Sequence, residues 1–181
     1  MRRFFLAILL LGLGTTSIAK ADGLDIFLND NTVSLDYLTT YRGSDINFGY
    51  LYSTGGDWAA NVGLLVLGRE YGADSKIEGG LGAKAFVTSV GGESVLAGSI
   101  GGQLTYYPRS SKFGLGGYAY YAPDIITFGG KSFFQYGVRA EYQLIETASA
   151  FIGLHKISVE TDSGLKRDID DGFHVGINLR F

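Results

Sequence analysis

The chain of 181 residues contains no cysteine, two prolines and two histidines. Without cysteine, neither disulfides nor a lipid-anchored cysteine can form. Two separated histidines and no cysteine make no metal-ligand set of recognised spacing. Its 15 basic residues are outnumbered by 18 acidic ones, so the basic patch that nucleic-acid binding needs is lacking. We therefore expect no nucleic-acid partner, no metal and no cofactor.

The chain also lacks any apolar run long enough for a membrane helix, which needs ~20 residues. Its 28 glycines argue against a helical domain, because each costs up to ~1 kcal/mol inside a helix. Tyrosine and phenylalanine are frequent, with 12 of each. Transmembrane barrels place aromatics at both membrane interfaces and use glycine where the lumen is crowded. If the chain spans a membrane, it must do so as a closed β-barrel.

The first 21 residues are typical of a secretory signal peptide. Arg2 and Arg3 precede an apolar run over residues 4–13, and Ala19 and Ala21 have the spacing of a signal-peptidase site. A membrane anchor is the alternative, but this run has only about half the ~20 residues that a span requires. We predict cleavage after Ala21, so that residues 22–181 form one exported domain.

The end of the chain has the alternation of a β-strand with one apolar face. That face is formed by Phe173, Val175, Ile177, Leu179 and Phe181, and the other carries His174, Gly176, Asn178 and Arg180. A final amphipathic strand that stops on an aromatic residue looks like the insertion signal of bacterial outer-membrane barrels. It predicts an outer-membrane location and recognition by the barrel assembly machinery, with membrane lipids and lipopolysaccharide as the surrounding partners.

Similar alternating segments recur along the chain between clusters of Gly, Asp, Asn and Ser. Ten are expected, near residues 24–28, 33–37, 46–52, 58–67, 77–87, 96–106, 113–121, 134–144, 148–159 and 173–181. The pattern predicts an all-β fold, a transmembrane antiparallel up-and-down barrel of about ten strands, with eight as the alternative. The facing of 58–67 stays open because its alternation is blurred. Residues 160–171 are expected to form a loop.

The even number of strands predicts which connections lie at which end of the barrel, since both termini of such barrels lie in the periplasm. The connections near Asn29, Gly55, Gly91, 123–130 and 162–170 are then outside. Those near Gly43, Gly72, Ser110 and Glu146 face the periplasm. The outer loops are short, which argues against a large receptor or adhesin.

The polar faces of these segments provide the candidate luminal residues. They are Asp36, Asn47, Glu78, Lys84, Gln103, Arg139, Glu141, His174, Asn178 and Arg180. With so few strands, the interior is wide enough for side chains or one small ligand. Paired charges that fill the lumen are one interpretation, because buried charges need partners. A narrow pore or binding cavity is the other, and the sequence leaves both open.

Two further interpretations concern other classes of protein. Some small outer-membrane barrels modify lipid A, and a lipid-modifying enzyme would be centred on His155 or His174; His155 with Ser149 or Ser158 and Glu160 could be arranged for such chemistry. In a soluble periplasmic barrel the facing would be inverted, with Phe134, Tyr136 and Val138 inside and Arg139 and Glu141 in water. We expect a non-catalytic barrel with a structural or passive-permeation role, and a small channel or binding barrel as the alternative.

Three stretches together carry a family resemblance. They are residues 48–52 leading to Asp57 and Trp58, residues 113–128 with Tyr-Tyr-Ala-Pro-Asp at 120–124, and residues 170–176. In these the chain resembles the YfaZ-like family of outer-membrane proteins, and the similarity extends over the whole of residues 22–181. The resemblance implies a small outer-membrane β-barrel and brings no catalytic residues.

Overall fold

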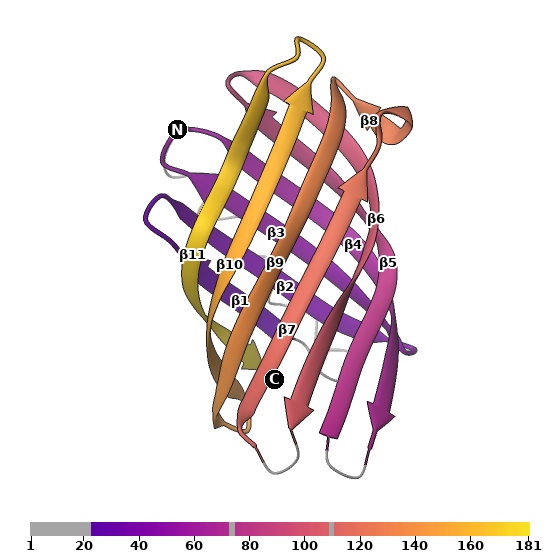
Figure 1. Cartoon of the computed structure of the whole chain (residues 1–181), viewed down its shortest axis with the longest axis vertical. Coiled ribbons are helices and arrows are strands. Elements are labelled where there is room, and N and C mark those ends of the chain that lie inside the picture. Colours follow the sequence, from indigo (N-terminus) through magenta and orange to yellow (C-terminus); the bar gives the residue numbers. More distant parts are fainter. Residues whose placement is uncertain (1–22, 73–74, 109–110) are drawn as a thin grey trace.

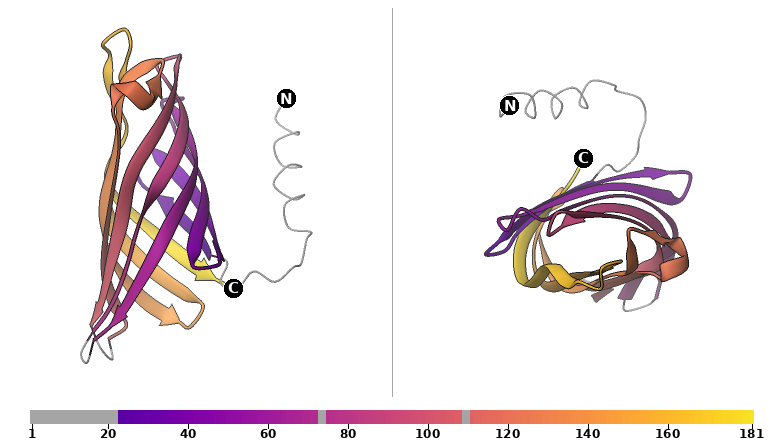
Figure 2. Two further views of the ribbon diagram at one scale, coloured as in Figure 1. Left: turned by 90° about the vertical axis from the view of Figure 1, so that its right-hand side faces the viewer. Right: turned by 90° about the horizontal axis from the view of Figure 1, so that it is seen from above.

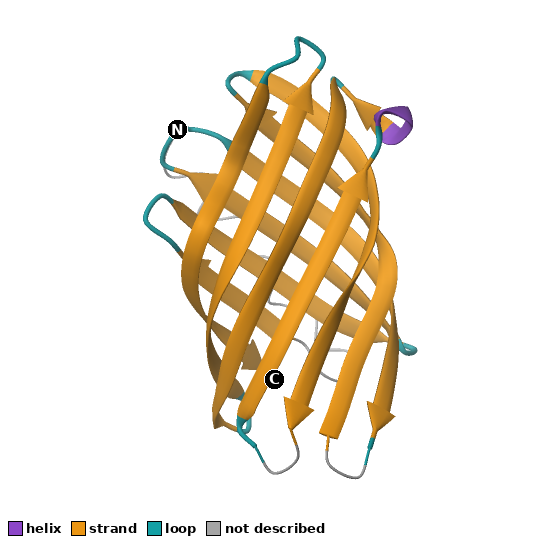
Figure 3. Ribbon diagram, in the orientation of Figure 1, coloured by secondary structure: helices purple, strands orange, loops and turns teal. Residues whose placement is uncertain are grey.

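The computed structural model describes residues 23–72, 75–108 and 111–181. The predicted signal peptide and its cleavage after Ala21 lie outside the described residues. Within them, nearly every residue belongs to a strand or a tight turn (Figure 3). No helix in the described part of the chain has the length and hydropathy to cross a bilayer.

Ten strands form the wall and follow one another in chain order. They are β1 (Gly23–Leu28), β2 (Thr32–Tyr41), β3 (Ser44–Ser53), β4 (Trp58–Tyr71), β5 (Ser75–Val90), β6 (Glu93–Pro108), β7 (Phe113–Ala122), β9 (Gly130–Ile145), β10 (Ala148–Thr161) and β11 (Lys166–Arg180). An eleventh strand, β8 (Thr127–Phe128), has two residues and pairs only with β6. The expected number of ten strands is confirmed.

The wall closes on itself through antiparallel neighbours. β1 pairs with both β2 and β11, and β5 pairs with both β4 and β6. Figure 2 shows the resulting ring of strands from above. Closure satisfies the backbone hydrogen-bonding groups of each wall strand, so the described barrel offers no open sheet edge to lipid.

Side chains alternate between the two surfaces of the wall, as the period of a strand requires. In β3, Phe48 and Tyr50 are exposed on the outer surface, whereas Asn47 and Leu51 are buried in the interior. The segment whose facing the sequence left open behaves in the same way. In β4, Leu64 is exposed outside and Leu65 is 4% exposed inside.

The outer surface carries an aliphatic belt between two groups of aromatic residues. The belt includes Val62, Leu64, Val66, Leu81, Leu96, Ile100, Leu104, Leu115, Val138, Ile152, Leu154, Val175 and Ile177. The aromatic groups are Tyr50, Tyr52, Tyr121, Phe128 and Phe134 toward one end, and Tyr41, Tyr71, Tyr106, Phe113 and Tyr142 toward the other. A closed barrel with such a belt and girdles is a transmembrane barrel.

The inverted facing of a soluble barrel is wrong for this chain. Phe134, Tyr136 and Val138 are all exposed on the outer surface. Glu141 is 4% exposed and Arg139 is half-buried, both on the inner surface. In water, this arrangement would expose a continuous apolar band, which only a bilayer can cover.

The described connections lie at the ends that strand parity predicts, and the expected turns near Gly72 and Ser110 include residues that lie outside the described ranges. Turns at 29–31, 54–57, 91–92 and 162–165 lie at the end shown uppermost in Figure 1, together with the 123–129 loop. The turns at 42–43 and 146–147 lie at the other end, with Gly23 and Phe181. We call these the outer and the periplasmic end, following the rule for barrels of this kind.

The expectation of a loop over 160–171 is wrong. β11 begins at Lys166, and its first residues pair with β10 across a bulge at Ile157 and Ser158, so only 162–165 is a loop. The physical reason is that cross-strand polar pairs stabilise this charged stretch as a strand. Lys156 Nζ, for example, donates to Asp168 Oδ2 at 2.7 Å and to Asp171 Oδ2 at 3.0 Å.

The interior is divided into an apolar and a polar part. Buried apolar residues near the outer ends of β3 to β7 and β9 to β11 form what we call the apolar plug: Leu51, Ala59, Phe86, Val90, Val95, Ala97, Ala122, Phe133, Ile157, Val159 and Ile169. Every member lies within five residues of the outer end of its strand. Below the plug, toward the periplasmic end, the inward side chains are mostly polar.

Candidate functional site

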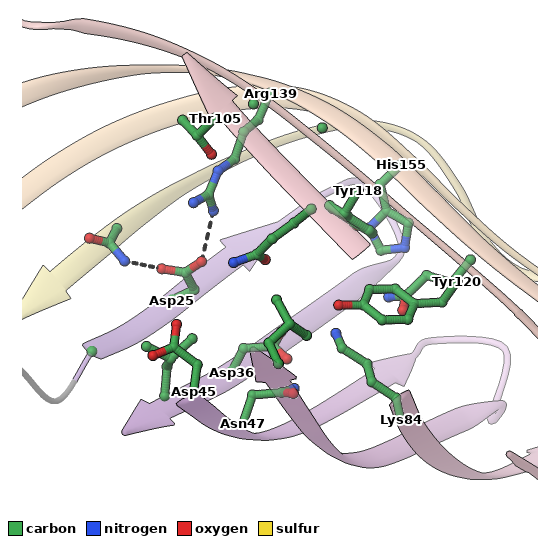
Figure 4. Close-up of a pocket in the computed structure, with 18 of the residues that line it drawn as sticks. Asp25, Asp36, Asp45, Asn47, Lys84, Thr105, Tyr118, Tyr120, Arg139 and His155 are labelled. Carbon is green, nitrogen blue, oxygen red and sulfur yellow. Dashed lines mark hydrogen bonds and ion pairs between the residues drawn. The ribbon is translucent and has the colours of Figure 1, made fainter. Parts of the chain in front are cut away.

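The polar part of the interior encloses a chamber of about 280 Å³ (Figure 4). Leu51, Ala59, Phe86 and Ile157 from the plug line it, whereas Val90, Val95, Ala122 and Phe133 do not. The chamber therefore ends where the apolar plug begins.

One side of the chamber is occupied by a charged network around Arg139 of β9. Its guanidinium Nη1 lies 2.8 Å from Asp25 Oδ2, and Nη2 lies 3.5 Å from Glu141 Oε2. The hydroxyl of Tyr107 donates to Glu141 at 2.5 Å, and the Asn178 amide donates to Asp25. Each of these carboxylates accepts from two donors, and the single Arg139 cation leaves the network with one net negative charge.

Lys84 of β5 lies apart from that network. Its Nζ is 4.3 Å from the centroid of the Tyr120 ring, a cation–π contact. Asp36 interacts with it electrostatically but forms no ion pair with it. Instead, Asp36 Oδ2 accepts from Ser34 Oγ at 3.2 Å.

Luminal glycines make room for these polar side chains. A Cβ at Gly49 would overlap Asp36, and one at Gly63 would overlap Lys84 and Asn47. The inward face of the wall can hold these long side chains only because the neighbouring strands present no side chain there.

The chamber continues to the periplasmic end of the barrel. Tyr107 and Arg180 line both the chamber and a second cavity of about 520 Å³, which is bordered by residues of the periplasmic strand ends such as Tyr71 and Ser75. Glu78 lies near this mouth, where Arg69 and Lys76 form ion pairs with it at 2.9 and 2.8 Å. The polar lumen thus opens at the end of the barrel that we call periplasmic.

Two histidines lie at the upper boundary of the chamber. His155 Nε2 is 3.4 Å from Asp170 Oδ2, and the ring centroids of His155 and His174 are 5.6 Å apart. Phe27 packs against both rings, at 5.2 and 4.9 Å. Both histidines are at least 95% buried, and neither nitrogen of His155 has a hydrogen-bond partner.

The arrangement suggested for lipid chemistry is not present. His155 faces the lumen next to Asp170, whereas Ser158 donates to Asp168 on the other face of the wall. Residues 155 and 158 are three apart, so a strand places them on opposite faces. Ser149 borders the periplasmic mouth, and Glu160 pairs with Lys131 and Lys166 at the outer end. In the described ranges, no group of three metal-binding side chains is arranged to hold an ion.

The candidate luminal residues lie as follows. Asp36, Asn47, Glu78, Lys84, Gln103, Arg139, His174, Asn178 and Arg180 line the chamber, and Glu141 borders the periplasmic cavity. In the predicted insertion strand, Phe173, Val175, Ile177 and Phe181 are exposed on the outer surface, and Leu179 is half-buried.

Sequence reasoning missed Asp25, Tyr107 and Tyr120, which all line the chamber. Asp25 alternates with Leu24 and Ile26, so reading β1 as a full wall strand would have found it. Tyr120 carried no such signal, because Tyr121 beside it is equally aromatic and faces outward.

Above the belt, the outward cluster of Lys156, Ser158, Asp168 and Asp171 marks where the wall meets water. Partial burial raises the pKa of Asp168, but the hydrogen bonds from Lys156 and Ser158 outweigh it, so that this pKa lies below its ordinary value. Asp168 therefore stays ionised and keeps the start of β11 paired.

Solved structures of several outer-membrane proteins are similar to this chain. The KdgM porin, in complex with disordered oligogalacturonate, has 12% identity and a TM-score of 0.45, over 89% of this chain and 99% of that one. The outer-membrane channel DcaP of Acinetobacter baumannii has 10% identity and a TM-score of 0.40 over 87% of this chain. The chain spans only 54% of DcaP. At TM-scores below 0.5, nothing about this chain's function rests on these structures.

No curated protein matches the chain. A family model does match it, over residues 1–181, and that model is described as YfaZ precursor. The match extends over the complete sequence, including the three stretches that suggested the resemblance, and the chain therefore belongs to the YfaZ family.

Proposed function

We propose that this protein is a non-catalytic outer-membrane barrel that is closed toward the outside and open toward the periplasm. The observation that carries the proposal is the apolar plug, in which buried side chains from eight of the ten wall strands pack together in the outer part of the lumen. The barrel then holds a chamber that exchanges solutes with the periplasm and conducts none across the membrane.

The packing of the plug supports closure. Phe86 of β5 and Phe133 of β9, whose strands are separated in the ring by β6 and β7, have centroids 4.2 Å apart and are 1% and 0% exposed. Val90, Val95 and Ala122 around them are at most 1% exposed. Interiors packed in this way leave few voids larger than a water molecule, and apolar gaps stay dry. Ions cannot cross such a layer without large desolvation costs.

The lack of a hydroxyl group hydrogen-bonded to either histidine, among the described residues, supports a non-catalytic role. Among the described residues, no serine or threonine hydroxyl forms a hydrogen bond with His155 or His174. An acyltransferase or hydrolase would need such a pair within about 3 Å.

Location and assembly complete the proposal. The terminal strand with Phe181 would be read by the barrel assembly machinery, after export with cleavage behind Ala21. Lipids and lipopolysaccharide would contact the aliphatic belt and the aromatic groups at its two ends.

Conductance in a planar bilayer tests closure. The wild-type barrel should produce no discrete current steps. A variant with Phe86→Ser and Phe133→Ser removes both rings and adds hydroxyls that hold water, so it should conduct. Heat modifiability on a detergent gel checks that both proteins are folded. Discrete steps from the wild type would overturn the proposal.

A further inference from the structure

We propose that the chamber binds a compact anionic solute at Lys84, which reaches the site from the periplasm past Arg180. This inference rests on the proposed function, because it needs a lumen that is open to the periplasm. It adds the chemical class of the solute and the residues that hold it.

The distribution of charge partners is the first argument. Each carboxylate in the chamber accepts a hydrogen bond or an ion pair from a neighbour: Asp25 from Arg139, Glu141 from Tyr107, Glu78 from Arg69, Asp45 from Thr40 and Asp36 from Ser34. In the described chain, Lys84 and Arg180 form no ion pair with any carboxylate. Arg180 Nε donates to the neutral Asn178 at 3.2 Å. Arg180 also interacts with Tyr107 and, through charge, with Glu141 and Glu78, and Lys84 interacts through charge with Asp36. Among the described luminal cations, these two are the ones that no carboxylate contacts at ion-pair distance, so both can contact an anion.

These two cations mark the route of a solute. Arg180 lies at the junction of the two cavities, and Lys84 lies deeper, beside Tyr120 (Figure 4). A charged mouth in a low-dielectric wall raises the local concentration of the opposite charge. An anion would meet Arg180 first and Lys84 second.

Unpartnered polar atoms in the same chamber as Lys84 are the second, independent argument. The Tyr120 hydroxyl, Gln135 Oε1, both nitrogens of His155 and His174 Nδ1 are buried, line the chamber and have no hydrogen-bond partner. Tyr120, His155 and His174 are 1%, 3% and 5% exposed. Buried polar groups normally have partners, because a buried donor or acceptor without one has lost its hydrogen bonds to water and gained none in return. A bound solute would satisfy them.

The chemistry of these groups indicates the class of solute. An ammonium, a phenol and imidazole N–H groups are donors, and together they suit a carboxylate or a similar compact anion. Gln135 Oε1 is an acceptor and suits a hydroxyl group. Asp36 opposes an anion through its charge, but it does not contact Lys84 Nζ, whereas a solute could.

The volume limits the size of the solute. The chamber of about 280 Å³ lies just below the ~300 Å³ at the lower end of ligand pockets. One small ring with its substituents fits, and a polymer does not. The site therefore favours a hydroxylated monocarboxylate of single-ring size.

Three probes on one ring skeleton test the charge preference: glucuronate, glucose and glucosamine. Isothermal titration calorimetry with the refolded barrel in detergent measures their binding. Glucuronate should bind at least about tenfold more tightly than glucose, because one charge-assisted hydrogen bond contributes ~1.5–3 kcal/mol. Glucosamine should bind most weakly. Equal binding of glucuronate and glucose would overturn the proposal.

Variants assign the effect to the site. Lys84→Met should remove the preference for glucuronate, Lys84→Arg should keep it, and Tyr120→Phe, which deletes only the hydroxyl, should weaken glucuronate binding several-fold. Lys131→Met is the matched control, since Lys131 lies at the outer end and pairs with Glu160. An unchanged preference in a folded Lys84→Met protein would refute the assignment.

The outcomes separate this inference from the proposed function. If none of the probes binds and the bilayer stays silent, the anion site is wrong and the closed barrel stands. If the wild type conducts, the proposed function is wrong whatever the probes do.

Discussion

Replacing Phe133 by alanine is expected to destabilise the barrel more than the same change at Phe134. The two residues are adjacent in β9 and identical in chemistry, but they face opposite sides of the wall. Phe133 is 0% exposed within the plug, with its ring 4.2 Å from that of Phe86. Phe134 is 39% exposed and faces the bilayer. The pair therefore separates packing in the plug from contact with lipid.

The magnitude follows from what each deletion leaves behind. Both remove a phenyl ring from an apolar environment, which costs ~1.5–3 kcal/mol. Only Phe133→Ala leaves a cavity, since lipid fills the space at position 134. A cavity of up to ~100 Å³ at ~24 cal/mol per Å³ adds up to ~2.4 kcal/mol. The lost contact with Phe86 adds ~0.5–1.5 kcal/mol. We expect Phe133→Ala to cost about 2 kcal/mol more than Phe134→Ala.

Equilibrium unfolding by urea in phospholipid vesicles measures this difference. The single tryptophan, Trp58, reports the transition by fluorescence. The double variant Phe86→Ala/Phe133→Ala should cost less than the sum of the two single changes, because the rings share one contact. Equal losses at 133 and 134, within ~0.5 kcal/mol, would show that the plug is not close-packed and would refute the reasoning.

Other predictions concern the wall, the charge network and assembly. Gly82→Ala places a Cβ against backbone atoms of the adjacent strand and should lower the heat-modifiable fraction, whereas Gly55→Ala in an open turn should not. Arg139→Met leaves two luminal carboxylates without their cation and should lower the free energy of unfolding in urea by about 2–3 kcal/mol. Arg69→Met breaks an exposed ion pair and should lower it by at most about 1 kcal/mol. Phe181→Ala should reduce assembly in cells, scored by outer-membrane fractionation, while leaving stability after refolding in vitro unchanged.

Much of the fold could be predicted because strand alternation is a local property. The side chains that face lipid in β9, such as Phe134 and Val138, were assigned from period-two alternation alone. The number of strands followed from the turn residues, and the end of the barrel at which each connection lies followed from the even strand number. The local pattern gives the wrong prediction at Lys166–Asp171, where the run of charged residues predicts a loop and the structure has the start of β11. Side chains of β10 pair with those charges. Because these partners lie on another strand, the sequence of β11 alone does not reveal them.

The candidate site could be predicted only as a list of inward residues. Which of them pair depends on the closure of the ring, which brings Asp25 within 2.8 Å of Arg139 across 114 residues of sequence. The same closure leaves Lys84 beside Tyr120 instead of a carboxylate.

The sequence by itself determined that this chain forms a transmembrane barrel with an apolar outside and a polar inside, because alternation, turns and composition are properties of short segments. Only the tertiary structure decided that the lumen has two parts. Residues such as Phe86, Val95 and Phe133 come from different strands, and register places them at one level, where they meet as a plug. Whether a barrel of this size is open or closed depends on which side chains share a level, and strand register and shear set that level.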